Sequence, residues 1–250
     1  MNPKLTLATA RRVLQQIRRD KRTIAMILVI PLVLLTLLWW IFQDVPVRPG
    51  EAPVFDSLGP RLMGLFPLIM MFLITSVTTL RERVSGTLER LMTSPAGRGD
   101  LVLGYGLAFS LVATVQGVVV VAYSILVLGL DFAGPVWALM LIIVLDAILG
   151  TALGLAASSV ARTEFQAVQM MPAFLLPQML LAGFFLPRNQ MPQALEWISN
   201  ALPLSYAIDA IKELATNTDA SSIWNEVAIL AAFIVGALIL GVVTLRRRTP

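Results

Sequence analysis

The sequence contains no cysteine and no histidine. Without cysteine the chain can form no disulfide and offers no thiolate, and without histidine most general-base and metal-binding schemes are excluded as well. No GxxxxGK[ST] loop for nucleotide phosphates occurs either. We therefore expect no catalytic residue, no metal ligand and no cofactor-binding residue in this chain, and we expect it not to be an enzyme by itself.

Charged residues are also scarce, at 14% of the chain, whereas 57% is hydrophobic and the mean hydropathy is +0.81. A hydrocarbon core about 30 Å thick needs about 20 helical residues to cross it. Mostly apolar stretches of that length lie at 23–42, 62–80, 101–128, 136–160, 167–186 and 223–245. The sequence therefore predicts an all-α polytopic membrane protein with six transmembrane helices, forming a single transmembrane domain over residues 1–250.

The basic residues cluster beside alternate connections between these stretches. Fifteen of the 19 fall within 1–22, 81–100, 161–166 and 246–250, which leaves Arg48, Arg61, Arg188 and Lys212 for the other connections. The positive-inside rule then predicts that both termini are cytosolic in a cytoplasmic, multi-pass membrane protein. Basic charge placed in this way indicates a lipid membrane as the partner and not a nucleic acid.

Two segments outside the apolar stretches have helical patterns. In the cytosolic segment 1–22, apolar side chains share one face: Ala10, Val13, Leu14 and Ile17. This pattern predicts an amphipathic interfacial helix on the inner leaflet, with a simple basic retention signal as the alternative. The extracytoplasmic segment 187–222 is too polar to span and too apolar for an ordinary loop, so we expect short re-entrant or interfacial helices there.

Asp146 is the one acidic residue deep inside a predicted span. Burying its charge near the bilayer centre would cost about 2.5 to 3.5 kcal/mol, and Gln116 on the preceding span is the nearest polar candidate to compensate it. Asp146 either belongs to a translocation path or proton relay, or it is a structural hydrogen-bonded clasp between the two helices. On the same span, Gly150 and Gly154 predict close packing of another helix of the chain. In the next span, Pro172 and Pro177 predict a kinked or broken helix.

The cytosolic segment 81–100 has the most specific local pattern. Gly86 and Thr87 can begin a short helix, and Pro95 discourages helix at the residue before it. An apolar ridge at helical spacing follows, made of Leu88, Leu91 and Met92. Such a ridge suits a groove on a partner protein, and a helix that lies on the membrane is the alternative.

Two stretches resemble the permeases of type-2 ATP-binding-cassette (ABC) exporters, especially the daunorubicin-resistance-permease-like branch. One is RERVSGTLERLMTSPAGRGDLVLGY at 81–105, and the other is LAGFFLPRNQMPQALEWISNALPLSYAIDAIKEL at 181–214. The resemblance implies that residues 87–93 form a coupling helix that docks on a separate ABC ATPase subunit. The ATPase-coupling residues that it implies are Glu82, Arg83, Gly86, Thr87, Leu88, Glu89, Arg90, Leu91, Met92, Ser94 and Pro95.

The resemblance also implies an assembly and an energy source. Two permease copies, expected as a homodimer that pairs chiefly through the first and fifth spans, would carry two ATPase subunits. ATP and magnesium would bind to those subunits and not to this chain. Closure of the ATPase pair on ATP would shift the permeases from inward to outward access.

The expected function is ATP-driven export of hydrophobic or amphipathic compounds, such as drug-like molecules or lipids. The alternatives are export of a polysaccharide or glycolipid precursor, a proton-coupled secondary carrier that uses Asp146, and a membrane scaffold without transport. Adaptable apolar and polar side chains of the third to fifth spans suit amphipathic cargo. The candidate substrate-path residues are Gln116, Asp146, Met170, Met171, Phe174, Gln178, Phe184 and Phe185.

Overall fold

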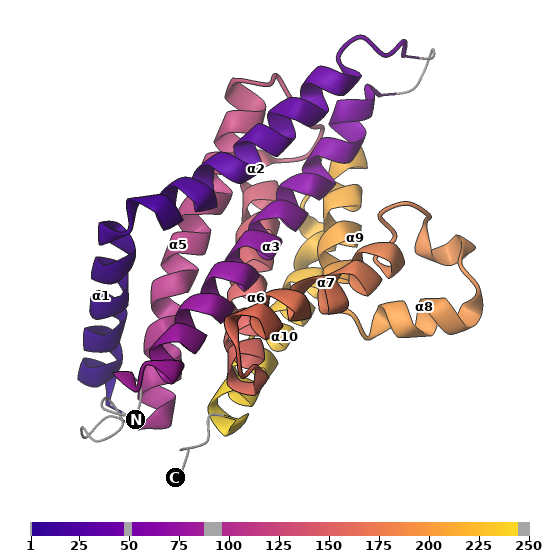
Figure 1. Cartoon of the computed structure of the whole chain (residues 1–250). Coiled ribbons are helices and arrows are strands. Elements are labelled where there is room, and N and C mark those ends of the chain that lie inside the picture. Colours follow the sequence, from indigo (N-terminus) through magenta and orange to yellow (C-terminus); the bar gives the residue numbers. More distant parts are fainter. Residues whose placement is uncertain (1, 48–51, 88–96, 245–250) are drawn as a thin grey trace.

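The computed structural model describes residues 2–47, 52–87 and 97–244, and within these ranges the chain is all helical and contains no strand. Its longer helices stand side by side as a bundle (Figure 1). In chain order the helices are α1 (Pro3–Arg19), α2 (Lys21–Phe42), α3 (Val54–Val84), α5 (Arg98–Leu126), α6 (Val136–Val160), α7 (Glu164–Leu181), η1 (Arg188–Gln190), α8 (Gln193–Asn200), α9 (Pro203–Thr216), η2 (Ser221–Ile223) and α10 (Trp224–Thr244).

Five helices of the described ranges are long and apolar enough to cross a membrane, namely α2, α3, α5, α6 and α10. They correspond to five of the predicted spans. The remaining predicted span, 167–186, corresponds to α7, which has 18 residues and whose apolar character is diluted by two prolines and by glutamines. An all-helical membrane protein is confirmed, and the count of six spans is not.

The start of α1 and the end of α10 lie at the same end of the bundle (Figure 1). The backbone N–H of Asn2 donates to Asp100 at the start of α5 over 2.8 Å, and the Thr244 hydroxyl lies 2.6 Å from that of Ser159 at the end of α6. The start of α10 lies at the other end, where the Trp224 ring packs in a tilted arrangement near the Trp137 ring of α6. The return from α6 to α10 is therefore made by α7, α8 and α9 together.

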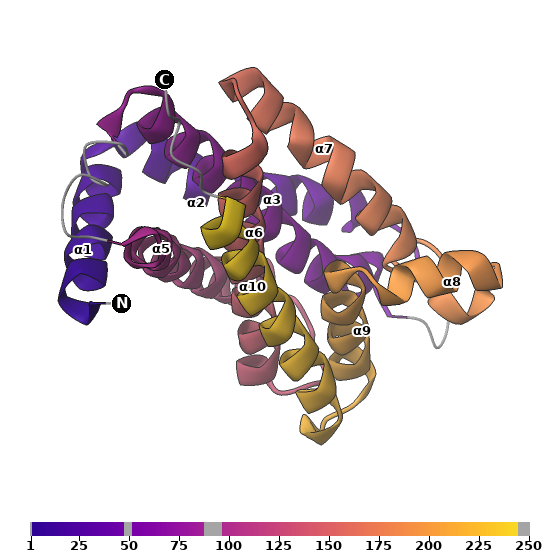
Figure 2. The ribbon, with the colours of Figure 1, turned by 90° about the horizontal axis from the view of Figure 1, so that it is seen from below.

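The closest helix packing is between α3 and α6. A Cβ atom at Gly150 would lie 2.4 Å from the Leu68 carbonyl oxygen, and one at Gly154 would lie 2.6 Å from that of Phe72. The predicted role of these glycines in packing within the chain is confirmed. Helix α6 is thereby held at the centre of the bundle, between α3, α5 and α10 (Figure 2).

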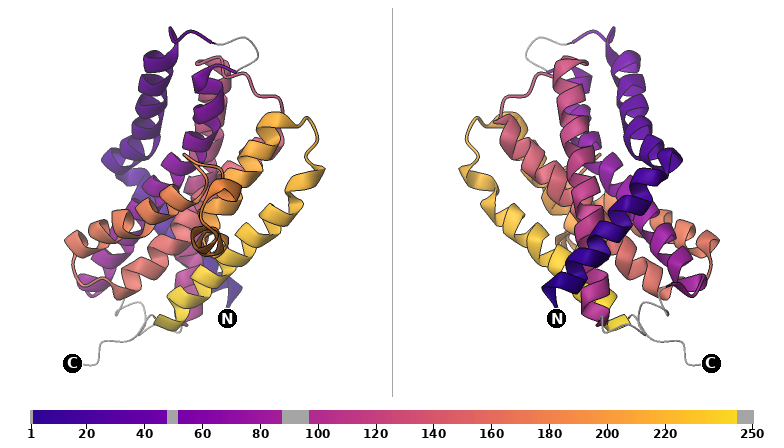
Figure 3. Two further views of the ribbon diagram at one scale, coloured as in Figure 1. Left: turned by 90° about the vertical axis from the view of Figure 1, so that its right-hand side faces the viewer. Right: turned by 90° about the vertical axis from the view of Figure 1, so that its left-hand side faces the viewer.

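Helix α1 is amphipathic as predicted, but its apolar face is covered by protein. Ala10, Val13 and Ile17 pack against apolar residues of α5. The helices cross so closely that a Cβ at Gly104 of α5 would lie 2.6 Å from the Thr9 Cβ atom. Figure 3 shows α1 lying across α5. The face that was expected to rest on the inner leaflet therefore fixes α1 to the bundle.

The predicted short helices between 187 and 222 are present as α8 and α9. Helix α9 enters the core, where Leu204, Ile208 and Ile211 are completely buried. Helix α7 runs without a break through both of its prolines and ends at Leu181, five residues before the predicted end of the span. Gly183, with a φ of 77°, turns the chain there, because glycine adopts this left-handed conformation at no steric cost.

Candidate functional site

The last turn of α3 carries Arg81, Glu82 and Arg83, and we call these three residues the α3 junction. Helix α3 has 31 residues, which corresponds to about 46 Å at 1.5 Å per residue. It is therefore longer than the roughly 30 Å of a hydrocarbon core, so its last turn can lie beyond the apolar part of a membrane. Each residue of the junction contacts a different part of the bundle.

Glu82 joins α3 to α1 and α5. Its carboxylate accepts hydrogen bonds from Arg12 Nη2 at 2.8 Å and Arg12 Nη1 at 3.4 Å, and it also accepts the Tyr105 hydroxyl proton. Arg12 Nη2 also donates to the Tyr105 oxygen at 2.6 Å. Glu82 is only 9% exposed, so its hydrogen bonds with Arg12 and Tyr105 are largely shielded from water. Hydrogen bonds between charged groups are strongest in such surroundings.

Arg81 and Arg83 join α3 to α7 and α6. Arg81 donates two hydrogen bonds to Glu164, of 2.8 and 2.7 Å, and these bonds lower the pKa of the Glu164 carboxyl. Arg83 donates to the carbonyl oxygens of Ser159, at 2.6 Å, and Ala161. These carbonyls belong to the end of α6, where the helix offers acceptors without helical donors, so Arg83 acts as a C-terminal cap.

The α3 junction therefore fixes the end of one helix to four others. Immediately after it, Gly86 takes a φ of 73° and turns the chain, and Thr87 lies near Ser85, with 3.0 Å between their hydroxyl oxygens. The other residues of the predicted coupling segment fall outside the described residues, so the predicted short helix stays a prediction. They are Leu88, Glu89, Arg90, Leu91, Met92, Ser94 and Pro95.

Asp146 and Gln116 are both fully buried, but they do not form the predicted pair. The Gln116 amide instead donates to the Ile27 carbonyl of α2 over 2.8 Å. That carbonyl has no helical donor because Pro31, four residues later, lacks an N–H group. Asp146 faces α3, with Oδ2 3.4 Å from a Cβ at Gly64, and within the described residues its carboxyl has no hydrogen-bond partner.

The substrate-path residues of the α7 region separate into an exposed and a buried set. Phe174 and Phe185 are 44% and 67% exposed, and Met170 and Met171 are half-buried. Phe184 and Gln178 are buried, and the Gln178 side-chain oxygen accepts the backbone N–H of Leu204 at 3.4 Å. The predicted path residues therefore do not line one common surface of this chain.

Sequence reasoning missed the partners that the α3 junction binds: Arg12, Tyr105 and Glu164. Arg12 lies outside the apolar face predicted for segment 1–22, and Tyr105 enters the sequence analysis only as the last residue of the stretch 81–105 that resembles a family. A usable signal was present, because Glu82 lies between two arginines and Glu164 lies two residues after Arg162, both near helix ends. The sequence does not say which helix end each would meet.

Apolar helices of membrane-spanning length and a charged junction at one end define a multi-pass membrane protein. The chain belongs to the ABC-2 type transporter family, whose model matches residues 4–214. This membership confirms the resemblance found in the sequence.

Individual relatives agree with the family assignment. The chain is 31% identical over 192 residues to the probable multidrug ABC transporter permease YbhR of Escherichia coli (strain K12), covering 74% of the chain and 51% of that relative. It is 24% identical to ABC transporter G family member 20 of Dictyostelium discoideum, covering 77% and 27%. It is 24% identical to the linearmycin resistance permease protein LnrN of Bacillus subtilis (strain 168), covering 67% and 44%. The chain therefore spans about half the length, or less, of these curated relatives.

Proposed function

We propose that this chain is the transmembrane subunit of an ATP-driven exporter in the cytoplasmic membrane, with the α3 junction on the cytosolic side. A separate ABC ATPase subunit docks on the segment that follows Ser85 and supplies the work. The chain itself contributes the passage and no nucleotide chemistry. Hydrophobic or amphipathic compounds are the proposed cargo, in keeping with the words multidrug and linearmycin resistance in the names of two relatives.

The observation that carries this proposal is the connectivity of the α3 junction. Arg81, Glu82 and Arg83 bind α7, α1 with α5, and α6, respectively. A push on the adjoining segment would therefore move five helices at once. Because packed helices shift as rigid elements between discrete arrangements, such a connection is what a subunit driven from outside requires.

A second copy of the chain is part of the proposal. Helix α2 is the least buried of the five candidate membrane spans in the described part of the chain. Only 17% of its most apolar 18-residue stretch is buried. Large apolar side chains of α7 are also exposed, including Phe165, Leu176 and Leu180. These two helices are the ones through which the family resemblance implies pairing, so we propose that the passage forms between two copies.

The proposal is tested by co-purification of the chain with its candidate ATPase from membranes, followed by ATP-dependent transport of a fluorescent amphiphile in proteoliposomes. We expect Leu91→Arg to abolish both ATPase association and transport, because a charge would enter the apolar ridge. Leu195→Arg, at an exposed apolar position of α8, is the control and should leave association intact. Equal association of both variants with the ATPase would refute the proposal.

A further inference from the structure

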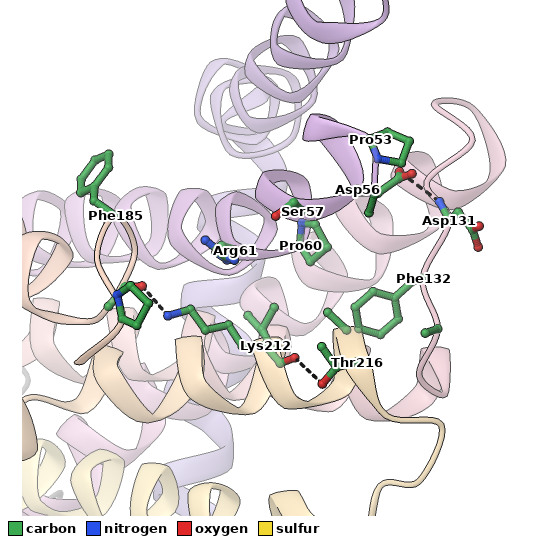
Figure 4. A pocket seen from close by; sticks show the side chains of 16 residues that line it. Pro53, Asp56, Ser57, Pro60, Arg61, Asp131, Phe132, Phe185, Lys212 and Thr216 are labelled. Carbon is green, nitrogen blue, oxygen red and sulfur yellow. Dashed lines mark hydrogen bonds between the residues drawn. The ribbon is translucent and has the colours of Figure 1, made fainter. Parts of the chain in front are cut away.

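A pocket of about 800 Å³ lies toward the end of the bundle opposite the α3 junction. Its walls come from the start of α3, the turn between α5 and α6, the turn after α7, and helix α9 (Figure 4). This volume lies in the range of small-molecule sites. We call it the charged pocket and define it by Asp56, Arg61, Asp131 and Lys212, which all line it.

The basic side of the charged pocket consists of Arg61 and Lys212. Arg61 Nη1 donates to the Phe184 carbonyl at 3.1 Å, and the Lys212 ammonium donates to the Gly183 carbonyl. Among the described residues neither cation forms an ion pair, and the nearby Asp209 is already paired with Arg188. Burial lowers the pKa of Lys212, and the charge of Arg61 lowers it further, whereas the charge of Asp209 raises it. Two cations therefore lie near each other, and neither has an ion-pair partner among the described residues.

The acidic side consists of Asp56 and Asp131. The Asp131 backbone N–H donates to Asp56 Oδ1 at 3.2 Å, which holds the two residues together. Neither carboxylate forms an ion pair within the described part of the chain. Asp56 and Arg61 both lie on α3, with an axial separation of about 7.5 Å. Figure 4 shows Asp56 and Asp131 on one side of the pocket and Arg61 and Lys212 on the other.

The surface between the charged groups is largely apolar. Pro60 and Phe132 line the cavity there, and Phe185 lies at its edge. Ile211 is a further apolar lining residue. Water could solvate the two cations and the two carboxylates separately. A ligand that carries a negative and a positive group on a short apolar frame would bind the cations and the carboxylates at once. Guanidinium and ammonium groups bind phosphate oxygens, and carboxylates bind an ammonium.

We propose that the charged pocket binds a zwitterionic phosphoethanolamine headgroup, with the phosphate on Arg61 and Lys212 and the ammonium on Asp56 and Asp131. The headgroup belongs to a membrane lipid or to a lipid-like cargo. This inference deepens the proposed function by naming a headgroup class for it. The binding site itself does not depend on an ATPase.

The test is lipid binding to the purified chain in detergent, measured by native mass spectrometry with phosphatidylethanolamine and phosphatidylglycerol as probes. We expect preferential retention of phosphatidylethanolamine. Arg61→Gln together with Lys212→Gln should weaken retention of both lipids by about tenfold or more, because both phosphate donors are lost. Asp131→Asn should reduce the preference for phosphatidylethanolamine and spare phosphatidylglycerol. Lys21→Gln, at an exposed cation far from the pocket, is the control.

Soluble phosphoethanolamine is the second probe, because it separates headgroup binding from lipid binding. Displacement of phosphatidylethanolamine by the soluble headgroup supports a headgroup site. Failure to displace it, or unchanged lipid retention in the double variant, would overturn the inference. Lys212→Arg keeps the charge and should retain binding, which guards against misfolding of the glutamine variants. Lipid binding without ATPase association would refute the proposed function and leave the pocket standing, and the reverse result would do the opposite.

Discussion

At the residue scale, the informative groups are buried polar side chains that find partners the sequence does not indicate. Gln116 was matched to Asp146 by depth along adjacent helices, but it donates to the Ile27 carbonyl. Depth could be estimated from the sequence, whereas the rotation of each helix about its axis could not. The Gln116 amide therefore binds the Ile27 carbonyl, which Pro31 leaves without a helical donor, and not Asp146.

Asp146 gives the first prediction. Its buried carboxyl has no hydrogen-bond partner among the described residues, and an unsatisfied buried polar group costs about 1 to 3 kcal/mol. We expect Asp146→Leu to raise the thermal unfolding temperature in detergent and Asp146→Asn to leave transport unchanged. Gln116→Leu is the control and should lower the unfolding temperature, because it removes the hydrogen bond to Ile27. Loss of transport in Asp146→Asn would support a proton-coupled carrier instead.

Lys212 gives a prediction about pH. Its pKa is lowered from 10.5, first by burial and then by Arg61 and Arg188, with Asp209 acting in the opposite direction. Raising the pH through this lowered pKa removes the ammonium, so phosphate affinity should fall at a lower pH than an ordinary lysine would allow. The same shift affects folding stability without ligand. Between the lowered pKa of Lys212 in the folded chain and its ordinary pKa in the unfolded chain, the unfolded chain binds more protons, so the free energy of unfolding rises with pH.

The measurement for Lys212 is headgroup affinity as a function of pH in the wild-type chain and in Lys212→Arg. Arginine stays charged throughout, so the affinity of that variant should remain flat where the wild-type affinity declines. Identical pH profiles would show that Lys212 does not contribute to binding.

At the scale of elements, the contact between α3 and α6 depends on two glycines. Gly150→Ala would place a methyl group 2.4 Å from the Leu68 carbonyl oxygen, and such overpacking costs about 1 to 3 kcal/mol. We expect a lower unfolding temperature for this variant. Gly236→Ala on α10 is the matched control, since no atom lies within 4 Å of its added carbon. A similar unfolding temperature for both variants would contradict the described packing.

The attachment of α1 can be measured by a double-mutant cycle on Arg12 and Glu82. Their side chains are 29% and 11% exposed, whereas Arg81 and Glu164 are 65% and 50% exposed. We expect a coupling energy of about 1 to 3 kcal/mol for the first pair and below about 1 kcal/mol for the second, because exposed ion pairs are screened by water. The reverse order in unfolding measurements would show that α1 is not held by this contact.

Sequence patterns predicted which segments form helices better than they predicted which helices contact one another. Long apolar runs predicted the five helices that are long and apolar enough to cross a membrane, and the mixed composition of 187–222 predicted short helices. Both predictions succeeded because they depend only on residues close together in the sequence. The span predicted over 167–186 was placed by composition, whereas α7 ends at Leu181, just before the turn at Gly183, and α9 also enters the core. The α3 junction and the charged pocket join residues from distant parts of the chain, and no local pattern specifies such a pairing.

At the scale of the whole molecule, the arrangement of both described ends at one side of the bundle predicts accessibility. The chain lacks cysteine, so a single introduced cysteine reports its own position. In intact cells we expect a membrane-impermeant maleimide to label Ser221→Cys, which is exposed at the far end. Arg162→Cys, exposed near the α3 junction, should react only after permeabilisation. The opposite pattern would invert the orientation proposed for the permease.

Helix α3 carries Asp56 and Arg61 of the charged pocket near its first residues and the α3 junction at its last. One continuous helix thus joins the proposed headgroup site to the proposed ATPase-docking end. Energetic coupling between two binding events is reciprocal. If an occupied headgroup site strengthens binding of the ATPase, docking of the ATPase must strengthen headgroup binding by the same factor. The lipid composition of the membrane would then change how tightly the permease binds its ATPase.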